Sequence, residues 1–227
     1  MSFKPAAAAA GVPARSQALH TSSPTLGFDA GPLVWIDLEM TGLDARTDDI
    51  MEIAVIITDG NLTPVDDGIE YVVKVDRERL DRMDEWCTRQ HGSTGLTQAC
   101  LASSNTLSSV ESMVLDYVQK YIPERKVGVL AGNSVHVDRM FLSERMPRLL
   151  EYLHYRTSKD VSSIKELCRR WYNGSVAPPM VSENNAHRAL DDIRGSIKEL
   201  QWYREHIFVS PESFKFSGTP PSSTESH

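Results

Sequence analysis

Three strand-like segments near the start of this 227-residue chain limit the folds that it can adopt. Residues 33–39 and 50–59 are apolar runs with the length of buried β-strands, and the second run is rich in Ile and Val. A turn signal at residues 59–61 precedes a third strand at 69–75, as in a meander. Neighbouring strands of this kind require a sheet whose faces are covered by other elements.

Helical periodicity follows in the sequence. Apolar residues recur three and four apart between residues 110 and 122, and Ser108 and Glu111 are predicted to form a capping box at the start of that helix. A short strand at 127–131, a helix from Ser163 and a last helix around 190–200 complete the pattern. Strands in a block, then strands alternating with helices, predict an α/β fold with a mixed central sheet flanked by helices. We expect one domain at residues 32–209.

The two ends of the chain differ from this domain in composition. Residues 1–28 contain Lys4, Arg15 and His20 but no Asp or Glu, and they include five consecutive alanines. This composition is typical of a mitochondrial transit peptide, and the alternative for residues 1–31 is an untargeted disordered leader. Residues 210–227 are rich in Ser, Pro and Thr, which predicts a disordered tail. We therefore expect location in the mitochondrion, with the cytoplasm as the alternative.

Charge and hydropathy limit the partners that the protein can have. Proteins that grip a long nucleic acid usually carry a basic stripe, and a net charge of −7 disfavours such a grip without excluding a local basic pocket. No apolar run approaches the length of a membrane-spanning helix, so no membrane partner is expected. Cys87, Cys100 and Cys168 have no CxxC spacing and are predicted to be free thiols in a reducing compartment.

Two acids interrupt the first predicted strand. Asp37 and Glu39 are two residues apart, so their side chains point to the same face of a strand. Two like charges on a largely buried strand are unfavourable unless a cation compensates them, and a divalent ion bound by oxygen ligands does so. The alternative is a strand that ends near residue 36 and leaves both acids in water.

Two later segments carry further candidates. Asp138 follows a predicted strand and a Gly-Asn-Ser turn, at the strand-to-helix edge where α/β sheets bind ligands. A carboxylate favoured by the helix dipole is an equally good interpretation of Asp138 alone. His187, Asp191 and Asp192 open the last predicted helix. They are either a general base beside metal ligands or an N-terminal capping cluster.

Together these residues resemble the DEDD exonucleases of the ribonuclease H-like fold, in the branch that has a catalytic histidine. The segment Trp35-Ile-Asp-Leu-Glu-Met-Thr-Gly-Leu43 is similar to the opening motif of oligoribonucleases, and residues 130–138 and 161–172 resemble the same family. The resemblance spans residues 33 to 208. It implies two divalent ions, Mg²⁺ or Mn²⁺, with a general base, and the residues in these roles are the ligands Asp37, Glu39, Asp138 and Asp192 and the base His187.

The adjacent acids Asp191 and Asp192 are distinguished only by the family spacing. Residues four apart on a helix lie on nearly the same side, whereas residues five apart diverge. Helix geometry alone therefore pairs His187 with Asp191 if both lie inside the helix. The family spacing selects Asp192, which implies that His187 lies in the preceding loop or in the first turn.

The resemblance also implies a homodimeric 3′→5′ exoribonuclease that converts very short single-stranded RNA to nucleoside 5′-monophosphates. In such an enzyme Leu43 and Trp86 would flank the terminal base, and Tyr155 and Arg156 would reach across the dimer interface to the 5′ phosphate. Further substrate contacts would come from His91, Asn133 and Ser134. Alternatives are a core or interface position for Trp86, a turn role for Asn133 and Ser134, and packing at a strand start for Tyr155. His136 has no assigned role.

Two competing functions differ in what they require. An exonuclease of the same superfamily that acts on DNA or structured RNA would share the five catalytic residues, but it should present a basic face to a longer strand. A nucleic-acid-binding module with an inactive site should lack at least one of the acids, and none is missing.

Overall fold

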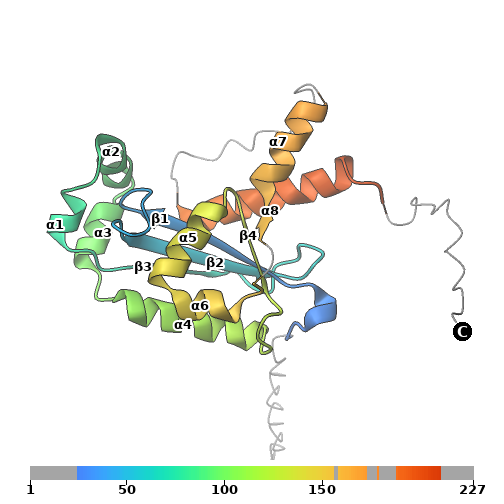
Figure 1. The fold of residues 1–227 in the computed structure, drawn as a ribbon, viewed down its shortest axis with the longest axis horizontal. Helices are drawn as coiled ribbons and strands as arrows, with labels where there is room; N and C mark the ends of the chain where they lie inside the picture. Colours follow the sequence, from blue (N-terminus) through green and yellow to red (C-terminus); the bar gives the residue numbers. More distant parts are fainter. Residues whose placement is uncertain (1–24, 156–157, 173–177, 179–187, 211–227) are drawn as a thin grey trace, which may run out of the picture.

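A five-stranded mixed sheet forms the centre of the computed structural model, which describes residues 25–155, 158–172, 178 and 188–210 (Figure 1). Antiparallel pairing joins β1 to β2 and β2 to β3, whereas β4 and β5 pair in parallel on the other side of β1. The predicted meander and the predicted mixed sheet are confirmed. In the order β3-β2-β1-β4-β5, the strands are β1 (Leu33–Met40), β2 (Ile50–Thr58), β3 (Ile69–Val72), β4 (Val129–Gly132) and β5 (Lys159–Asp160).

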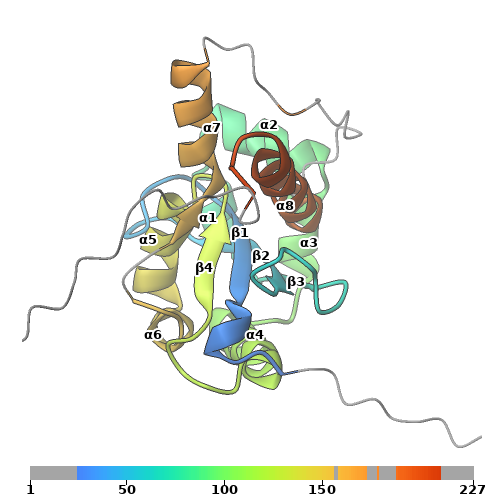
Figure 2. The same cartoon turned by 90° about the vertical axis from the view of Figure 1, so that its right-hand side faces the viewer.

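Helices cover both faces of the sheet (Figure 2). Helices α4 (Leu107–Tyr121), α5 (His136–Arg145) and α6 (Pro147–Tyr152) pack on one face, and α7 (Val161–Trp171) and α8 (Ala189–His206) pack on the other. A third apolar cluster lies beside the end of β3. It involves the helices α1 (Arg77–Leu80) and α3 (Leu96–Ala102), and α2 (Glu85–Ser93) lies between these two in the chain.

Strand β1 divides its side chains between the two cores. Val34, Ile36 and Leu38 belong to the α4–α6 core, while Trp35 belongs to the α7–α8 core. Because side chains alternate along a strand, Asp37 and Glu39 continue the face of Trp35. The sheet therefore directs both carboxylates toward the side that α8 covers.

The folded part begins before the boundary expected at residue 32. Residues Phe28–Ala30 form a 3₁₀ helix, and the backbone N–H of Leu26 donates to the carbonyl of Tyr121 at 2.7 Å. Residues 25–31, which were expected to belong to the leader, therefore pack with the domain. Residues 1–24 of the expected leader (1–31) and residues 211–227 of the expected tail (210–227) lie outside the described residues. All three cysteines are free and buried. Within the described ranges, no helix combines the length and apolar character that a membrane crossing needs.

The predicted helix starts need two corrections. Helix α4 is capped by Thr106, whose side chain accepts from the N–H of Ser109, so the predicted capping box of Ser108 and Glu111 is wrong. Helix α7 begins at Val161 with Asp160 as its cap, two residues before Ser163. In both cases a Thr or Asp slightly upstream provides the acceptor oxygen that an N-cap requires.

Glu111 instead caps a different helix. Its carboxylate is buried and accepts from the backbone N–H groups of Arg148 and Leu149, at 2.8 and 3.2 Å. These N–H groups lie in the first turn of α6, where a helix offers them no acceptor of its own. The N-cap residue of α6 makes no side-chain bond to them. Glu111 therefore fastens α6 to α4.

Replacing Glu111 by Ala should lower the free energy of unfolding by about 1–3 kcal/mol, because two buried N–H groups lose their acceptor. Glu111→Gln should cost less, since the amide oxygen still accepts one hydrogen bond. Urea unfolding followed by circular dichroism measures both changes.

Asp116 provides the matched control, because it is an exposed acid on the same helix. Its replacement by Asn should change the free energy of unfolding by less than about 0.5 kcal/mol. Equal effects of the Glu111 and Asp116 substitutions would contradict the capping role.

Candidate active site

Three carboxylates from two elements meet near the end of β1. Asp37 and Glu39 come from β1, and Asp192 comes from the first turn of α8. One possible ligand oxygen of each residue lies within 4.8 Å of those of the other two. All three residues are half-buried, so the group is shielded yet open to solvent. The predicted convergence of Asp37, Glu39 and Asp192 is therefore present in the fold.

Asp138 supplies a fourth acid next to this group. It lies in the first turn of α5, is buried, and accepts from the backbone N–H of Leu38 at 3.0 Å. Because β4 pairs with β1 only as far as Trp35, Leu38 lies beyond that pairing, and Asp138 provides its acceptor. This bond holds the start of α5 against the strand that carries the other two acids.

Three of the four acids have raised pKa values. Burial raises the pKa of Asp37 well above its usual range, and the charges of Asp138, Glu39 and Asp192 raise it further. Burial, followed by the charge of Asp192, raises the pKa of Glu39 to about 7. The pKa of Asp138 also rises to about 7 through burial, against the opposing effect of the N–H of Leu38. Ionising all of these groups together is therefore costly without a cation.

A divalent cation fits this donor set. Hard cations such as Mg²⁺, Mn²⁺ and Ca²⁺ prefer carboxylate oxygens, and their charge offsets the repulsion that raises these pKa values. Of the main influences on the pKa of Glu39, only the charge of Arg188 lowers it and so favours the ionised carboxylate. The acidic cluster thus has the chemistry of a divalent metal site.

Helix α8 separates the roles of its two adjacent acids. Asp191 is exposed and pairs with Arg194 at 2.9 Å, and Arg194 also donates to the carbonyl of Asp67. Asp192 joins the acidic group instead. Of the two acids, the structure therefore brings Asp192 to Asp37 and Glu39, in agreement with the spacing of the family.

Leu43 lies on the loop between β1 and β2, and hydrogen bonds from α5 hold this loop in place. Its side chain is 76% exposed. The loop is held by Arg145 of α5, which donates to the carbonyls of Ala45, Arg46 and Asp48. The side chain of Leu43 is therefore exposed on a restrained loop beside α5, where a ligand can contact it.

Trp86 and His91 lie on the same helix but in opposite environments. Trp86, near the start of α2, is 59% exposed, which contradicts the alternative that it belongs to the core. His91 is buried, its Nε2 lies 2.9 Å from the carbonyl oxygen of Met40, and its Nδ1 lies 3.8 Å from Glu39. Burial lowers the pKa of His91, which favours the neutral ring. A substrate contact by His91 stays a prediction, and its visible role is to support the end of β1.

Asn133 and Ser134 form the connection between β4 and α5. Asn133 donates to Ser196 of α8 at 2.7 Å and accepts from Ser162 of α7 at 3.1 Å. The N–H of Ser134 donates to Asp160 and Ser162, and Ser134 adopts a left-handed φ of 50°. These bonds agree with the turn role that was the alternative for both residues, and substrate contact stays a prediction.

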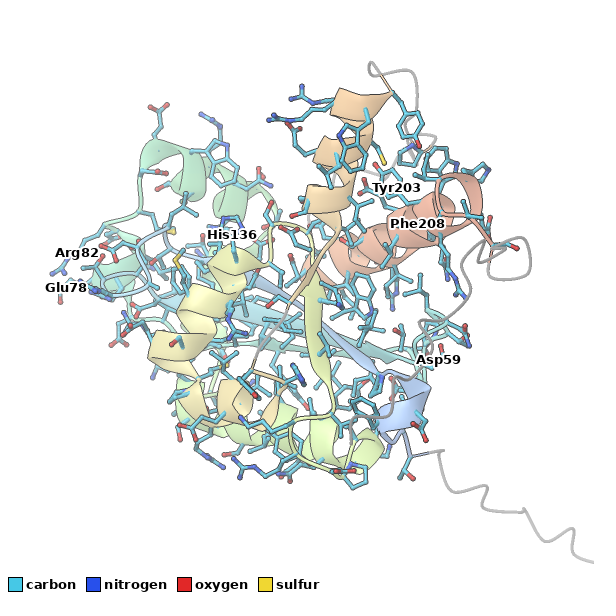
Figure 3. The ribbon with its side chains drawn as sticks, turned by 45° about the vertical axis from the view of Figure 1, so that its right-hand side comes forward. Asp59, Glu78, Arg82, His136, Tyr203 and Phe208 are labelled. Atoms are coloured by element: carbon cyan, nitrogen blue, oxygen red, sulfur yellow. The ribbon has the colours of Figure 1, made fainter. Side chains whose placement is uncertain are left out.

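The remaining predicted residues fall partly outside the described chain. Tyr155 is 58% exposed and stacks on His154, with ring centroids 5.4 Å apart. His187 and Arg156 lie outside the described residues. His136 is exposed at the start of α5, as Figure 3 shows, and no contact of its side chain indicates a role.

Sequence reasoning overlooked one polar cluster beside the acids. Glu52 is completely buried in β2 and faces Arg188, the N-cap residue of α8, at 3.0 Å. The available signal was a single carboxylate inside the otherwise apolar run Ile50–Thr58. Such a charge needs a buried partner, although the sequence does not identify which cation provides it.

Comparisons with known proteins agree with this site. Residues 34–200 match the RNase_T exonuclease family. The chain is 50% identical over 175 residues to a probable oligoribonuclease of Schizosaccharomyces pombe, covering 77% of this chain and 68% of that protein. It is 47% identical over 188 residues to the mitochondrial oligoribonuclease of Saccharomyces cerevisiae, covering 80% and 69%. It is 46% identical over 182 residues to an oligoribonuclease of Neisseria meningitidis, covering 80% and 95%.

Solved structures confirm the predicted ribonuclease H-like exonuclease fold. Exonuclease I from Methylocaldum szegediense superposes with a TM-score of 0.59 at 19% identity, covering 78% of this chain and 41% of that one. Exonuclease I of E. coli, solved with a dT13 oligonucleotide, gives a TM-score of 0.60 at 15% identity, covering 77% and 41%. Together with the acidic cluster and the sequence matches, these likenesses show that the chain belongs to the oligoribonuclease family of exonucleases.

Proposed function

We propose that this chain is a 3′→5′ exoribonuclease that degrades very short oligoribonucleotides to nucleoside 5′-monophosphates. The observation that carries the proposal is the convergence of Asp37, Glu39 and Asp192 within 4.8 Å. Curated relatives that are 46–50% identical over most of this chain are named oligoribonucleases, which supports the same substrate class here.

The acids and the histidine have separate roles in the proposed reaction. Two divalent ions, Mg²⁺ or Mn²⁺, would be held by Asp37, Glu39, Asp138 and Asp192. When bound, such ions supply positive charge at the scissile phosphate and favour ionisation of the attacking water. His187 would accept the proton of that water, because an imidazole with a pKa of about 6.5 exchanges protons readily near neutral pH.

Exposed apolar side chains would hold the 3′-terminal base. Trp86 offers an aromatic surface and Leu43 an apolar edge, and both are exposed. Stacking on an aromatic ring contributes about 1–3 kcal/mol per base and depends little on sequence. Polar contacts would come from His91, Asn133 and Ser134. The enzyme would therefore accept short fragments of any sequence.

The charge of the protein favours a short substrate over a long one. A net charge of −7 provides little long-range attraction for a polyanion, whereas a fragment of a few nucleotides needs only a few phosphate contacts. The likeness to exonuclease I, which was solved with single-stranded DNA in some structures, concerns the fold at 15–19% identity and does not extend to the substrate.

A homodimer would complete the substrate site. Tyr155 and Arg156 of one subunit would contact the 5′ phosphate of RNA bound to the other, since a two-fold interface gives each subunit the same patch. Large apolar side chains exposed on α7 and after α8 support such an interface (Figure 3 labels Phe208). They are Leu167, Trp171, Tyr172, Phe208 and Val209, with exposures from 42% to 70%.

The mitochondrion is the proposed location, with the cytoplasm as the alternative. The absence of acids from residues 1–28 is typical of a transit peptide. Relatives from Saccharomyces cerevisiae, Mus musculus and Bos taurus are named mitochondrial oligoribonucleases, which supports the same assignment. The relative from Neisseria meningitidis is named without a compartment.

End-labelled RNAs of two to twenty nucleotides test the activity with Mg²⁺ or Mn²⁺. The protein should release nucleoside 5′-monophosphates from the 3′ end, fastest from the shortest RNAs. Asp192→Asn should lower kcat by at least about a thousand-fold, because losing charge stabilisation of the transition state costs several kcal/mol.

Asp191→Asn is the matched control, because it removes the neighbouring acid and an exposed ion pair. This variant should keep activity within about two-fold, as expected for a surface pair. An inactive Asp191→Asn beside an active Asp192→Asn would reverse the assignment. Faster cleavage of long RNA or of DNA would contradict the proposed substrate.

The pH dependence of stability tests the acidic cluster without substrate. The folded-state pKa of Asp138 is about 7 against an ordinary 3.8, so the folded protein holds a proton that the unfolded chain has released. Asp138 therefore destabilises the metal-free protein least at low pH, where it is protonated in both states. Its ionisation destabilises the folded state increasingly as the pH rises toward 7. Relative to wild type, Asp138→Asn should gain stability in EDTA as the pH rises from about 4 to about 7, and the gain should level off above pH 7.

Urea midpoints in EDTA and in Mg²⁺ measure this effect. The stabilisation of wild type by Mg²⁺ should increase over the same pH range, because the ion replaces protons as the compensating charge. Asn keeps the oxygen that accepts from Leu38, so the helix start stays bonded. A difference between wild type and Asp138→Asn that does not change with pH would refute the interpretation.

Subunit mixing tests the proposed dimer. Tyr155→Ala together with Arg156→Ala should lower kcat/KM about ten- to a hundred-fold on dinucleotides with a 5′ phosphate, and much less on those without one. Mixing this protein with Asp138→Asn should restore about a quarter of wild-type activity, since half of the dimers then carry one intact composite site.

Each variant measured alone at the same total concentration is the control for mixing. Analytical ultracentrifugation gives the oligomeric state of each sample. A fully active monomer, or equal losses with and without the 5′ phosphate, would exclude a shared site.

A further inference from the structure

Glu52 occupies an unfavourable place for a carboxylate. It lies within β2, completely buried, and is paired in register with Glu39 of β1. Side chains paired across neighbouring antiparallel strands share one face, and like charges placed opposite each other are destabilising. Burial raises the pKa of Glu52, and the charge of Glu70 raises it further. A carboxylate in this position needs a compensating partner.

Arg188 provides that partner from the start of α8. Its Nη2 donates to Glu52 at 3.0 Å and to Glu70 of β3 at 2.7 Å. The backbone N–H of Ala189, the first residue of α8, also lowers the pKa of the Glu52 carboxyl, although it does not outweigh burial. Arg188 is the N-cap residue of α8 and makes no side-chain cap to its own helix, so its side chain links the start of α8 to β2 and β3.

This ion pair is a poor source of stability. Among the described residues, Glu52 Oε2 and Arg188 Nε are buried without a hydrogen-bond partner. Glu52 is fully buried, whereas the side chain of Arg188 is 42% exposed. The cost of dehydrating a buried carboxylate offsets much of its attraction to a partner, more so when some polar atoms stay unpaired. The pair instead fixes the position of Arg188 relative to Glu52.

The geometry is transmitted to Asp192 by one turn of helix. The N–H of Asp192 donates to the carbonyl of Arg188 at 3.1 Å, so fixing Arg188 fixes the backbone of Asp192. Asp192 is the only one of the three clustered acids that does not come from β1. Its distance from Asp37 and Glu39 therefore depends on where α8 begins.

We propose that Glu52 and Arg188 are positioning residues, which set the start of α8 against β2 and thereby hold Asp192 at the metal site formed with Asp37 and Glu39. This inference rests on the proposed metal-dependent function and adds two residues that need not touch metal or substrate. Outer contacts of this kind orient ligands, and their loss typically weakens metal binding roughly ten- to a hundred-fold.

A purely electrostatic effect of the same residues predicts a different pattern. Removing the negative charge of Glu52 would weaken cation binding, but removing the positive charge of Arg188 would strengthen it. Positioning predicts that both removals weaken binding. The sign of the Arg188 effect therefore separates the two explanations.

The experiment measures the affinity of full-length protein for Mn²⁺ by electron paramagnetic resonance, without substrate. Glu52→Gln and Arg188→Gln should each weaken Mn²⁺ binding roughly ten- to a hundred-fold. The double variant should bind no more weakly than the worse single variant, since both act through one contact. Arg188→Lys keeps the charge but not the planar fork, so it should lose less than Arg188→Gln. On short RNA, kcat should fall while KM changes little.

Asp191→Asn is the control, because it removes another acid-arginine pair from the same turn of α8. Its Mn²⁺ affinity should stay within about two-fold of wild type. Circular dichroism and urea midpoints show which variants are folded, and only these are compared. If Arg188→Gln does not fold, Arg188→Lys provides the test in its place.

Unchanged or stronger Mn²⁺ binding by Arg188→Gln or Arg188→Lys would overturn the inference, and so would unchanged binding by Glu52→Gln. If wild type binds Mn²⁺ and cleaves short RNA, these results reject the positioning role alone. Failure of wild type to bind Mn²⁺ or to cleave short RNA would reject the proposed function and this inference with it.

Discussion

Crowding of carboxylates around the end of β1 is the constraint on which the rest of the site depends. Burial raises the pKa values of Asp37, Glu39 and Asp138, and the charges of neighbouring acids raise those of Asp37 and Glu39 further, so the folded chain keeps these groups together against their electrostatic preference. Contacts from several elements fix them. The N–H of Leu38 binds Asp138, and the buried ring of His91 lies against the carbonyl of Met40.

The central sheet provides the rigidity that this arrangement needs. β1 has a hydrogen-bonded strand on each side and a helical layer on each face, so its carboxylates have little freedom to separate. Sites built on such elements hold their geometry better than sites built on loops. Leu43 lies on a loop, but the three carbonyl bonds of Arg145 restrain that loop from α5.

Short substrates suit the charge distribution that results. The four acids concentrate negative charge where a phosphate must bind, so the site depends on cations for its affinity and has little attraction for a long polyanion without them. The exposed Trp86 and Leu43 would add affinity in the proposed site through apolar contact, which does not depend on charge. A fragment of a few nucleotides needs no more than these local contacts.

The sequence by itself determined the local features. Alternation along residues 33–39 placed Asp37 and Glu39 on one face, and helical spacing identified the helices that became α4 and α8, because both signals depend on residues close together in the chain. The tertiary structure decided which distant groups meet. Asp191 pairs with Arg194, whereas Asp192 joins the acidic group. Glu111 caps α6 and not its own helix, and Glu52 pairs with Arg188. Local periodicity carries no information about such partners, because each contact depends on how whole elements pack.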